Sequence, residues 1–313
     1  MTDSLDGVRL DYTAGVIPSG YRVYGSVATR RKSITVRQLS PRVLWVDVFG
    51  YQATVLIGAN SAMLIDPLDV TRAHAIVELM RREFSVEISC IAYSHWHGDH
   101  IRGANSVLES TRWREPLSIV ATEVCASEVR VRGVYPLPTI ELRVGDSFDF
   151  EGIELRFSNV GGHTVDSTLI NVVADGVAHC VDLVHPLQAE FFSFGAALGF
   201  GDYVRALEKL SEQKWTVLTA GHGDIGWPSD VQLALEYCAG LKRVTAEAVR
   251  EVQSAPERAT GDSPMAAAAD LRKRVIASAV PKIERVWSAR LPGLKFAVES
   301  HVLSVLDDIL YFD

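Results

Sequence analysis

The chain has 313 residues, of which 48% are hydrophobic and 22% are charged, as in a folded globular protein. Its 31 basic and 39 acidic side chains give a net charge of −8, which argues against a nucleic-acid partner because phosphate backbones are bound by clustered Lys and Arg. Four separated cysteines with no CxxC pair indicate free thiols in a reducing compartment. No long apolar run and no secretory leader pattern is found, so we expect a cytoplasmic protein with no membrane partner.

Residues 1–40 lack a regular pattern and are predicted to be an irregular N-terminal segment. After them, short β-branched runs predict strands, and apolar residues at helical spacing predict helices. The predicted strands cover residues 43–48, 53–57, 62–65, 88–94, 118–122, 155–160, 169–173, 177–181 and 217–219, and the predicted helices cover residues 71–82, 202–210 and 229–253, followed by two more helical segments. This order predicts an α/β catalytic domain over residues 41–228 and a helical C-terminal extension over residues 229–313.

The segment from His95 to His100 reads His-Trp-His-Gly-Asp-His. Neutral imidazole is the commonest metal ligand near pH 7. Residues two apart in an extended segment point the same way, so His95 and His97 can bind one ion, while Asp99 and His100 can face a second. A polar loop with coincidental histidines is the alternative, but such a motif arises by chance in roughly one of two thousand chains of this composition.

Three further candidates follow predicted strands directly. His163 follows residues 155–160, Asp182 follows residues 177–181, and His222 follows residues 217–219 after two intervening residues. Loops at the carboxyl ends of strands are where α/β folds hold functional side chains. Each residue alone is as compatible with the surface as with a metal, but their shared position indicates a common site.

The ordered set of His95, His97, Asp99 and His100, then His163, Asp182 and His222, resembles the metallo-β-lactamase superfamily. Within it, the pattern is similar to the dinuclear hydrolases that include glyoxalase II and acyl-homoserine lactonases. The resemblance implies a four-layer αββα sandwich with two zinc ions per chain. It assigns one zinc to His95, His97 and His163 and the other to Asp99, His100 and His222, with Asp182 bridging them and Asp66 supporting the ligands from behind.

Departures from other branches of that family narrow the expected reaction. His97 stands where flavodiiron proteins carry Glu, and β-lactamases of this fold lack a bridging carboxylate like Asp182, so a hydrolase other than a β-lactamase is favoured. The ribonuclease branch shares the ligands, but the negative charge disfavours tRNA. Persulfide dioxygenases keep the motif with a single iron, so iron or manganese stays open as the metal.

The resemblance therefore implies a hydrolase in which a hydroxide bridging two zinc ions attacks a carbonyl, with Asp99 passing a proton to the leaving group. The expected substrate is a small ester or lactone, with a thioester or an amide also possible. Three alternatives stay open: a mononuclear iron persulfide-type dioxygenase, a phosphodiesterase, and a ligand-binding protein of the same fold without catalysis.

Candidates for the substrate pocket come from residues 185–201, which combine phenylalanines with small residues. This segment is either core or an apolar rim that favours acyl or aromatic substrates. The candidates are Trp96, His185, Phe191, Phe192 and Phe194. The alternative interpretation of Trp96 is a residue of the hydrophobic core, and the alternative interpretation of His185 is a surface residue.

Two features of the sequence have no assigned role in this site. His74, His179 and His301 have no evident partner and are interpreted as structural. The helical extension is expected either to cap the site, as the tail of glyoxalase II does, or to form a homodimer contact, which a mean hydropathy of +0.12 also favours.

Overall fold

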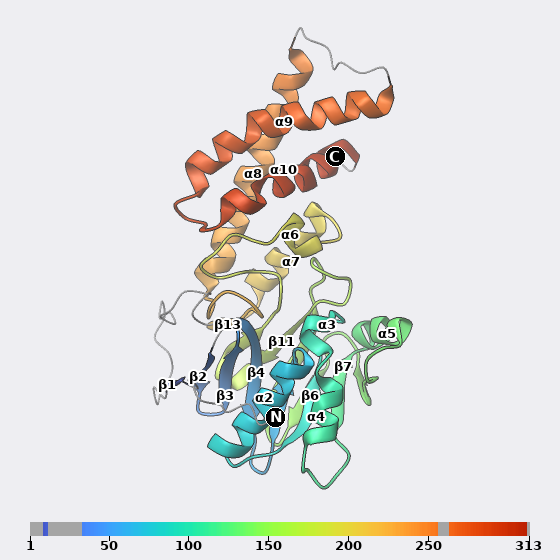
Figure 1. The fold of residues 1–313 in the computed structure, drawn as a ribbon, viewed down its shortest axis with the longest axis vertical. Helices are drawn as coiled ribbons and strands as arrows, with labels where there is room; N and C mark the ends of the chain where they lie inside the picture. The colour runs from blue at the N-terminus through green and yellow to red at the C-terminus, as the bar shows by residue number, and fades with distance from the viewer. Residues whose placement is uncertain (1–8, 12–32, 256–262, 312–313) are drawn as a thin grey trace.

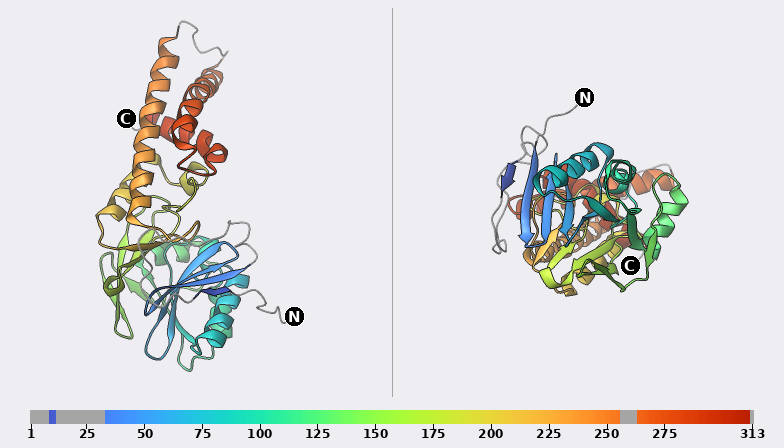
Figure 2. Two further views of the ribbon diagram at one scale, coloured as in Figure 1. Left: turned by 90° about the vertical axis from the view of Figure 1, so that its left-hand side faces the viewer. Right: turned by 90° about the horizontal axis from the view of Figure 1, so that it is seen from below.

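The computed structural model describes residues 9–11, 33–255 and 263–311 (Figure 1). Most of the predicted irregular segment lies outside these residues. In the described part, two β-sheets pack face to face and helices cover their outer faces (Figure 2). This is the predicted αββα sandwich, and the helical C-terminal region is also present.

The first sheet contains eight strands that neighbour one another in chain order. Strands β2 to β5 pair in antiparallel fashion, and strands β5 to β8 pair in parallel. The strands are β1 (Arg9–Asp11), β2 (Ile34–Ser40), β3 (Val43–Val48), β4 (Tyr51–Ile57), β5 (Ala62–Ile65), β6 (Ile88–Ala92), β7 (Ser118–Thr122) and β8 (Ile140–Leu142).

The second sheet has the order β13-β12-β11-β10-β9. Its strands are β9 (Ser147–Phe150), β10 (Ile153–Asn159), β11 (Thr168–Val172), β12 (Val177–His179) and β13 (Val217–Thr219). Only the β12–β13 pair in this sheet is parallel, so β12 and β13 end at the same edge. That edge receives the segments that carry Asp182 and His222.

Three layers of buried side chains hold the sandwich together. Trp45, Ile65 and Phe157 belong to the core between the two sheets. A second core lies between the first sheet and the helices α2 (Val70–Glu83), α4 (Ala104–Ser110) and α5 (Glu123–Arg132), and a third lies between the second sheet, α7 (Phe200–Glu212) and the C-terminal helices. Burial of these apolar faces is the main stabilising contribution to the fold.

The C-terminal helices are α8 (Pro228–Ser254), α9 (Pro264–Trp287) and α10 (Leu294–Tyr311). Helix α8 starts against the second sheet and extends away from it, and α9 and α10 pack along its outer part (Figures 1 and 2). One apolar core runs without a break from Leu169 in the second sheet to Leu306 in α10. The three helices are therefore packed on the sandwich and share its core.

The predicted strands at residues 43–48, 62–65, 118–122 and 217–219 have the predicted bounds. The prediction that residues 1–40 are irregular is wrong for the described residues 9–11 and 34–40, which form β1 and β2. Arg37 and Gln38 break the apolar run there and concealed the strand, although the side chain of Arg37 is buried. Among the described residues, no helix is long and apolar enough to cross a membrane.

Candidate metal centre

The seven predicted ligands meet at one edge of the sandwich, where strands from both sheets end. His95 and His97 lie in the loop between β6 and α3 (Gly98–Ile101), and Asp99 and His100 belong to α3 itself. The α3 turn forms directly after the loop, since the backbone N–H of His100 donates to the carbonyl oxygen of His97 at 3.1 Å. The other three ligands follow strands of the second sheet: His163, Asp182 and His222.

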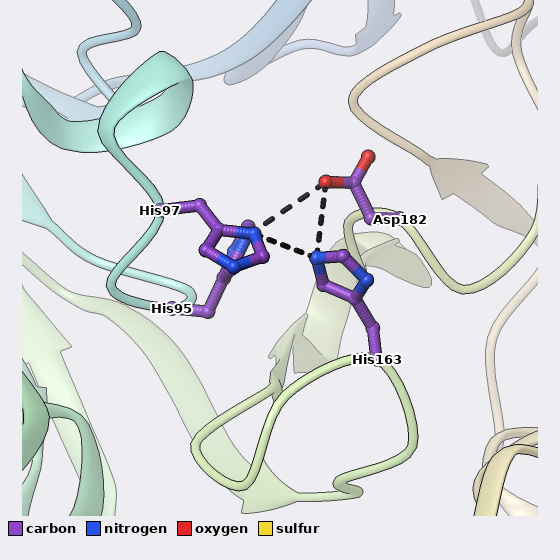
Figure 3. A group of neighbouring side chains, drawn as sticks. All are labelled: His95, His97, His163 and Asp182. Atoms are coloured by element: carbon purple, nitrogen blue, oxygen red, sulfur yellow. Dashed lines mark hydrogen bonds and ion pairs between the residues drawn. The ribbon is translucent and has the colours of Figure 1, made fainter. Parts of the chain in front are cut away.

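One group of four side chains consists of His95, His97, His163 and Asp182, whose ligand atoms all lie within 4.8 Å of one another (Figure 3). The His163 Nε2 and His97 Nδ1 atoms are 2.8 Å apart. Asp182 Oδ2 lies 3.5 Å from His163 Nε2 and 3.7 Å from His95 Nε2. Three imidazoles and a carboxylate oxygen therefore converge on one point, as the first metal position requires.

A second group consists of Asp99, His100 and His222, again with ligand atoms within 4.8 Å of one another. Asp182 also contacts this group, since its Oδ2 lies 3.2 Å from His100 Nε2 and its Oδ1 lies 3.3 Å from His222 Nε2. Asp182 therefore adjoins both groups. That is the position expected of a carboxylate bridging two cations.

The chemistry of the donors fits a metal pair. His95 Nε2, His100 Nε2 and Asp182 Oδ1 are buried, face the two ligand groups and have no hydrogen-bond partner in the described part of the chain. Leaving a buried polar atom unpaired costs about 1–3 kcal/mol, and three such atoms at these two groups are best explained by bound cations. Imidazole nitrogens and carboxylate oxygens are ligands that suit zinc and iron alike.

The charge states of the histidines also suit ligation. Burial lowers the pKa of His163 and that of His222 to about 4, so both rings are neutral at pH 7 and keep a lone pair for a metal. Burial disfavours the ionised form of Asp182, but the surrounding imidazoles, His100 above all, hold its pKa well below its ordinary value. His163 and His222 therefore offer neutral imidazoles beside an ionised carboxylate. At His100 burial disfavours the charged ring, but Asp182 outweighs burial and raises the pKa to about 9, so a metal would displace a proton there.

Asp66 reaches the ligands through Ser94. The Ser94 hydroxyl donates to Asp66 Oδ2 at 2.6 Å, and the Ser94 backbone N–H donates to Asp66 Oδ1 at 2.8 Å. The Ser94 hydroxyl oxygen is then free to accept from the Nδ1–H of His95 at 3.0 Å, which leaves His95 Nε2 bare toward Asp182. His179, which sequence reasoning left without a role, lies 3.0 Å from Asp66 Oδ2 through its Nε2.

Backbone conformation brings two acidic residues into place. Asp66 and Asp182 both have left-handed backbone angles, with φ of 57° and 59°, a region in which Asp is more common than most residues. Gly221 has φ of 81°, and a Cβ there would lie 2.4 Å from Val181 Cγ1. Glycine therefore allows the loop that carries His222 to pass close beside the loop that carries Asp182.

A cavity of about 320 Å³ opens over the two ligand groups. Three aromatic side chains line it, Phe49, Tyr51 and Phe191, together with Gln188, three glycines and five of the ligands, His97, Asp99, His163, Asp182 and His222. The Tyr51 ring packs edge-on against His222 at 4.5 Å between centroids. Sequence reasoning missed Tyr51, because an aromatic residue at the start of a strand carries no signal that separates it from core.

Of the five predicted pocket residues, only Phe191 is among the described side chains that line this cavity. Phe194 is buried in the core beside α7 and α10, and Phe192 is 64% exposed and points elsewhere. Trp96 packs against His97 on one side, with the guanidinium of Arg132 over its ring at 3.4 Å. Phe191, Phe192 and Phe194 differ in whether they line the cavity, because the loop turns sharply between residues 191 and 196.

His185 is buried beside the second ligand group and not on the surface. Its Nδ1 is hydrogen-bonded to a carboxylate oxygen of Glu190, whose other oxygen accepts from the His185 backbone N–H at 3.1 Å. Its Nε2 lies 3.7 Å from Asp182 Oδ1. Burial disfavours the charged ring, but Glu190 and Asp182 outweigh that effect and raise the pKa of His185 to about 10.

Comparison with known proteins agrees with this geometry. The sequence profile of the metallo-beta-lactamase superfamily matches residues 46–222, which include all seven ligands. The chain belongs to the metallo-beta-lactamase superfamily. The match begins in β3 and ends at His222, so it covers the sandwich and excludes the C-terminal helices.

Relatives within the metallo-beta-lactamase superfamily include two curated proteins. A hydroxyacylglutathione hydrolase of Roseobacter denitrificans is 27% identical over 154 residues, covering 49% of this chain and 50% of the relative. An atrochrysone carboxyl ACP thioesterase of Paecilomyces divaricatus is 26% identical over 201 residues, covering 61% of this chain and 58% of the relative. The chain thus spans little more than half the length of these relatives.

Solved structures support the fold. A metallo-beta-lactamase from Pontibacter korlensis superposes with a TM-score of 0.58 at 18% identity, covering 66% of this chain and 99% of the other. FIM-1 from Pseudomonas aeruginosa, in its mono-zinc form, gives 0.56 at 14% identity, with coverage of 66% and 95%. Both likenesses concern the sandwich architecture.

Proposed function

We propose that this protein is a dinuclear zinc hydrolase that acts on a small carboxylic ester or lactone, with thioesters as the next class. The observation that carries the proposal is the contact of Asp182 with both ligand groups, each of which also supplies imidazole nitrogens. When bound, a pair of divalent cations polarises a carbonyl oxygen and lowers the pKa of water.

Asp99 is the residue that we expect to move a proton. Its side chain is 48% exposed, lines the cavity and lies 3.5 Å from His100 Nε2 through Oδ2. A carboxylate at the boundary between the buried ligands and the cavity can accept a proton on one side and release it to a leaving oxygen on the other. Asp99 therefore combines ligation with acid–base function.

The cavity favours an apolar acyl or aromatic group beside the carbonyl. Phe49, Tyr51 and Phe191 supply three rings around a space of about 320 Å³, and no Lys or Arg is among the described residues that line it. Rings of this kind exclude water and bury apolar substrate surface. His185 does not line this cavity, and its Nε2 faces Asp182 Oδ1 at 3.7 Å, so we expect it to act on the carboxylate and not on the substrate.

Metal content and turnover together test the proposal. Protein purified without added metal is analysed by elemental mass spectrometry and assayed with phenyl acetate, an aliphatic δ-lactone, a thioester, an anilide and a phosphodiester. About two zinc ions per chain and turnover of the ester or lactone are expected. One iron per chain with oxygen consumption, or turnover of the phosphodiester alone, would overturn it.

A further inference from the structure

The loop over residues 180–199 joins β12 to helix α7, and it forms one side of the cavity. It presents Phe191 to the cavity, with the ring centroid 4.3 Å from that of His185 and 5.3 Å from that of His222. Any displacement of Phe191 therefore changes both the shape of the cavity and the packing on a ligand ring. The question is what holds this loop in place.

Regular structure in the described loop is limited to the short turn α6 (Ser193–Ala196), whose backbone is itself non-helical at Phe194 and Gly195. Leu187, Ser193, Phe194 and Ala196 all have left-handed backbone angles, with φ between 48° and 67°. Non-glycine residues in this region cost on the order of 1 kcal/mol or more each and persist only when surrounding contacts fix them. Within the loop, the Phe194 backbone N–H donates to the Phe191 carbonyl oxygen at 3.0 Å. Contacts from outside the loop add to such short-range bonds.

Several of the outside contacts come from the C-terminal helices. His301 of α10 is fully buried, and its Nε2 lies 2.9 Å from the carbonyl oxygen of Phe191. The carbonyl can only accept, so Nε2 carries the proton, and Nδ1 is left to accept from the hydroxyl of Tyr237 in α8 at 2.8 Å. Burial lowers the pKa of His301, which keeps the ring neutral and preserves this arrangement.

Neighbouring contacts hold the same loop to the same helices. The Ser193 backbone N–H donates to the Ser300 hydroxyl oxygen at 2.9 Å, and the Ala189 backbone N–H donates to the Pro292 carbonyl oxygen at 2.9 Å. The ring of Phe194 stacks on His301 with centroids 4.3 Å apart and an interplanar angle of 18°. His301 thus contacts the loop through one ring nitrogen and one ring face.

We propose that His301, oriented by Tyr237, is a positioning residue that holds the Phe191 carbonyl and so sets the fit of the substrate in the cavity. The C-terminal helices then determine substrate preference without contributing a side chain to the cavity. The catalytic part of this inference rests on the proposed hydrolase function, whereas the structural part does not.

The first test needs no activity. Hydrogen–deuterium exchange of residues 185–201 is compared in full-length wild type, His301→Leu, His301→Gln and Val302→Ala. His301→Leu removes the donor and should accelerate exchange in this loop by about tenfold or more, whereas His301→Gln retains a side-chain N–H donor and should restore part of the protection. Val302 is buried on the same helix, so Val302→Ala controls for loss of packing alone. Equal acceleration in Val302→Ala, or none in His301→Leu, would overturn the proposal.

The second test separates fit from chemistry. KM and kcat are measured with phenyl acetate and phenyl hexanoate, and metal content is measured in every variant. His301→Leu should raise KM for the hexanoate by about tenfold, with a smaller rise for the acetate and little change in kcat or bound metal. Tyr237→Phe, which removes one hydroxyl and is the gentler variant, should shift KM in the same direction by a smaller factor.

Three outcomes of the second test have distinct meanings. Loss of metal from His301→Leu, or a fall in kcat with KM unchanged, would show that His301 acts on the ligands and would overturn the positioning role. Turnover of neither ester by the wild type would count against the proposed function. In that case the exchange experiment still decides whether His301 holds the loop.

Discussion

The metal centre and the Phe191 side of the cavity lie a few ångströms apart but are held in place in different ways. The predicted ligands sit in short loops beside strand ends or in the adjoining α3 turn, within the sandwich. Phe191 belongs to a loop that contains several residues with left-handed backbone angles. The carbonyl oxygen of Phe191 is bound by His301, which lies 110 residues later in the chain. The comparison indicates that the sandwich supplies the chemistry and the C-terminal helices shape the substrate space, so substitutions on the two sides should have separable effects.

Asp182→Asn should give the largest effect, because Asp182 contacts imidazoles of both ligand groups. Replacing the carboxylate removes the charge that five imidazole nitrogens face at 3.2–3.7 Å. We expect bound metal to fall by at least half and kcat/KM to fall about 100- to 1000-fold. Elemental analysis and ester hydrolysis measure this, with Asp202→Asn, an exposed carboxylate paired with Arg205, as the control. Full metal content in Asp182→Asn would contradict the bridging role.

Ser94→Ala tests the support behind the ligands. It removes the hydroxyl that connects Asp66 to His95 Nδ1, so the ring loses its fixed orientation. Removing such a contact typically weakens metal binding or activity by about 10- to 100-fold, and competition with a chelator measures the change. Ser89→Ala is the matched control, since Ser89 bonds only to Ser61, away from the centre. Equal chelator resistance in both variants would show that Ser94 does not support the site.

Asp166→Asn tests whether the turn between His163 and β11 is closed to water. Burial raises the pKa of Asp166 to about 6, above the value of about 3.9 for an unfolded chain. The native state therefore binds more protons between these pH values, and this group lowers the free energy of unfolding as pH rises through that window. The variant should gain about 2–3 kcal/mol relative to wild type between pH 4 and pH 7 in urea denaturation of metal-free protein. A difference that does not change with pH would show that Asp166 is solvated.

Phe191→Ala should give the smallest effect on the chemistry and the clearest effect on fit. Deleting the ring enlarges the cavity while leaving every ligand atom in place, so KM for a hexanoate ester should rise about tenfold with kcat nearly constant. Phe192→Ala is the matched control, because that ring is 64% exposed and does not line the cavity. If Phe191→Ala lost metal, the two sides of the site would not be separable.

The metal-centre side of this comparison was largely predictable from the sequence. The His95–His100 motif and three residues following strands of the second sheet predicted a ligand set that the structure brings together, because a strand end determines where its loop begins. Asp66 was also predicted, through the family resemblance. The metal identity and the reaction remain predictions that the experiments above address.

The residues that form the Phe191 side of the cavity were not predictable in the same way. Phe191, Tyr237 and His301 have no local pattern that joins them, and they meet only when α8 and α10 pack on the loop. Phe192 and Phe194 were predicted to line the pocket because the sequence does not reveal the left-handed turn that directs them elsewhere. Strand β2 was missed for a related reason, since a buried arginine inside a strand is a tertiary feature.

The distribution of the ligands along the chain has one further consequence. Each ligand group draws members from both sides of the connection between α4 and β7: the four residues of the motif come before it, and His163, Asp182 and His222 come after it. A polypeptide cut in that connection would yield two fragments, neither of which holds a complete set of ligands for either cation. Metal binding would then occur only after the two fragments had reassembled, so bound metal could be used to detect the complete fold.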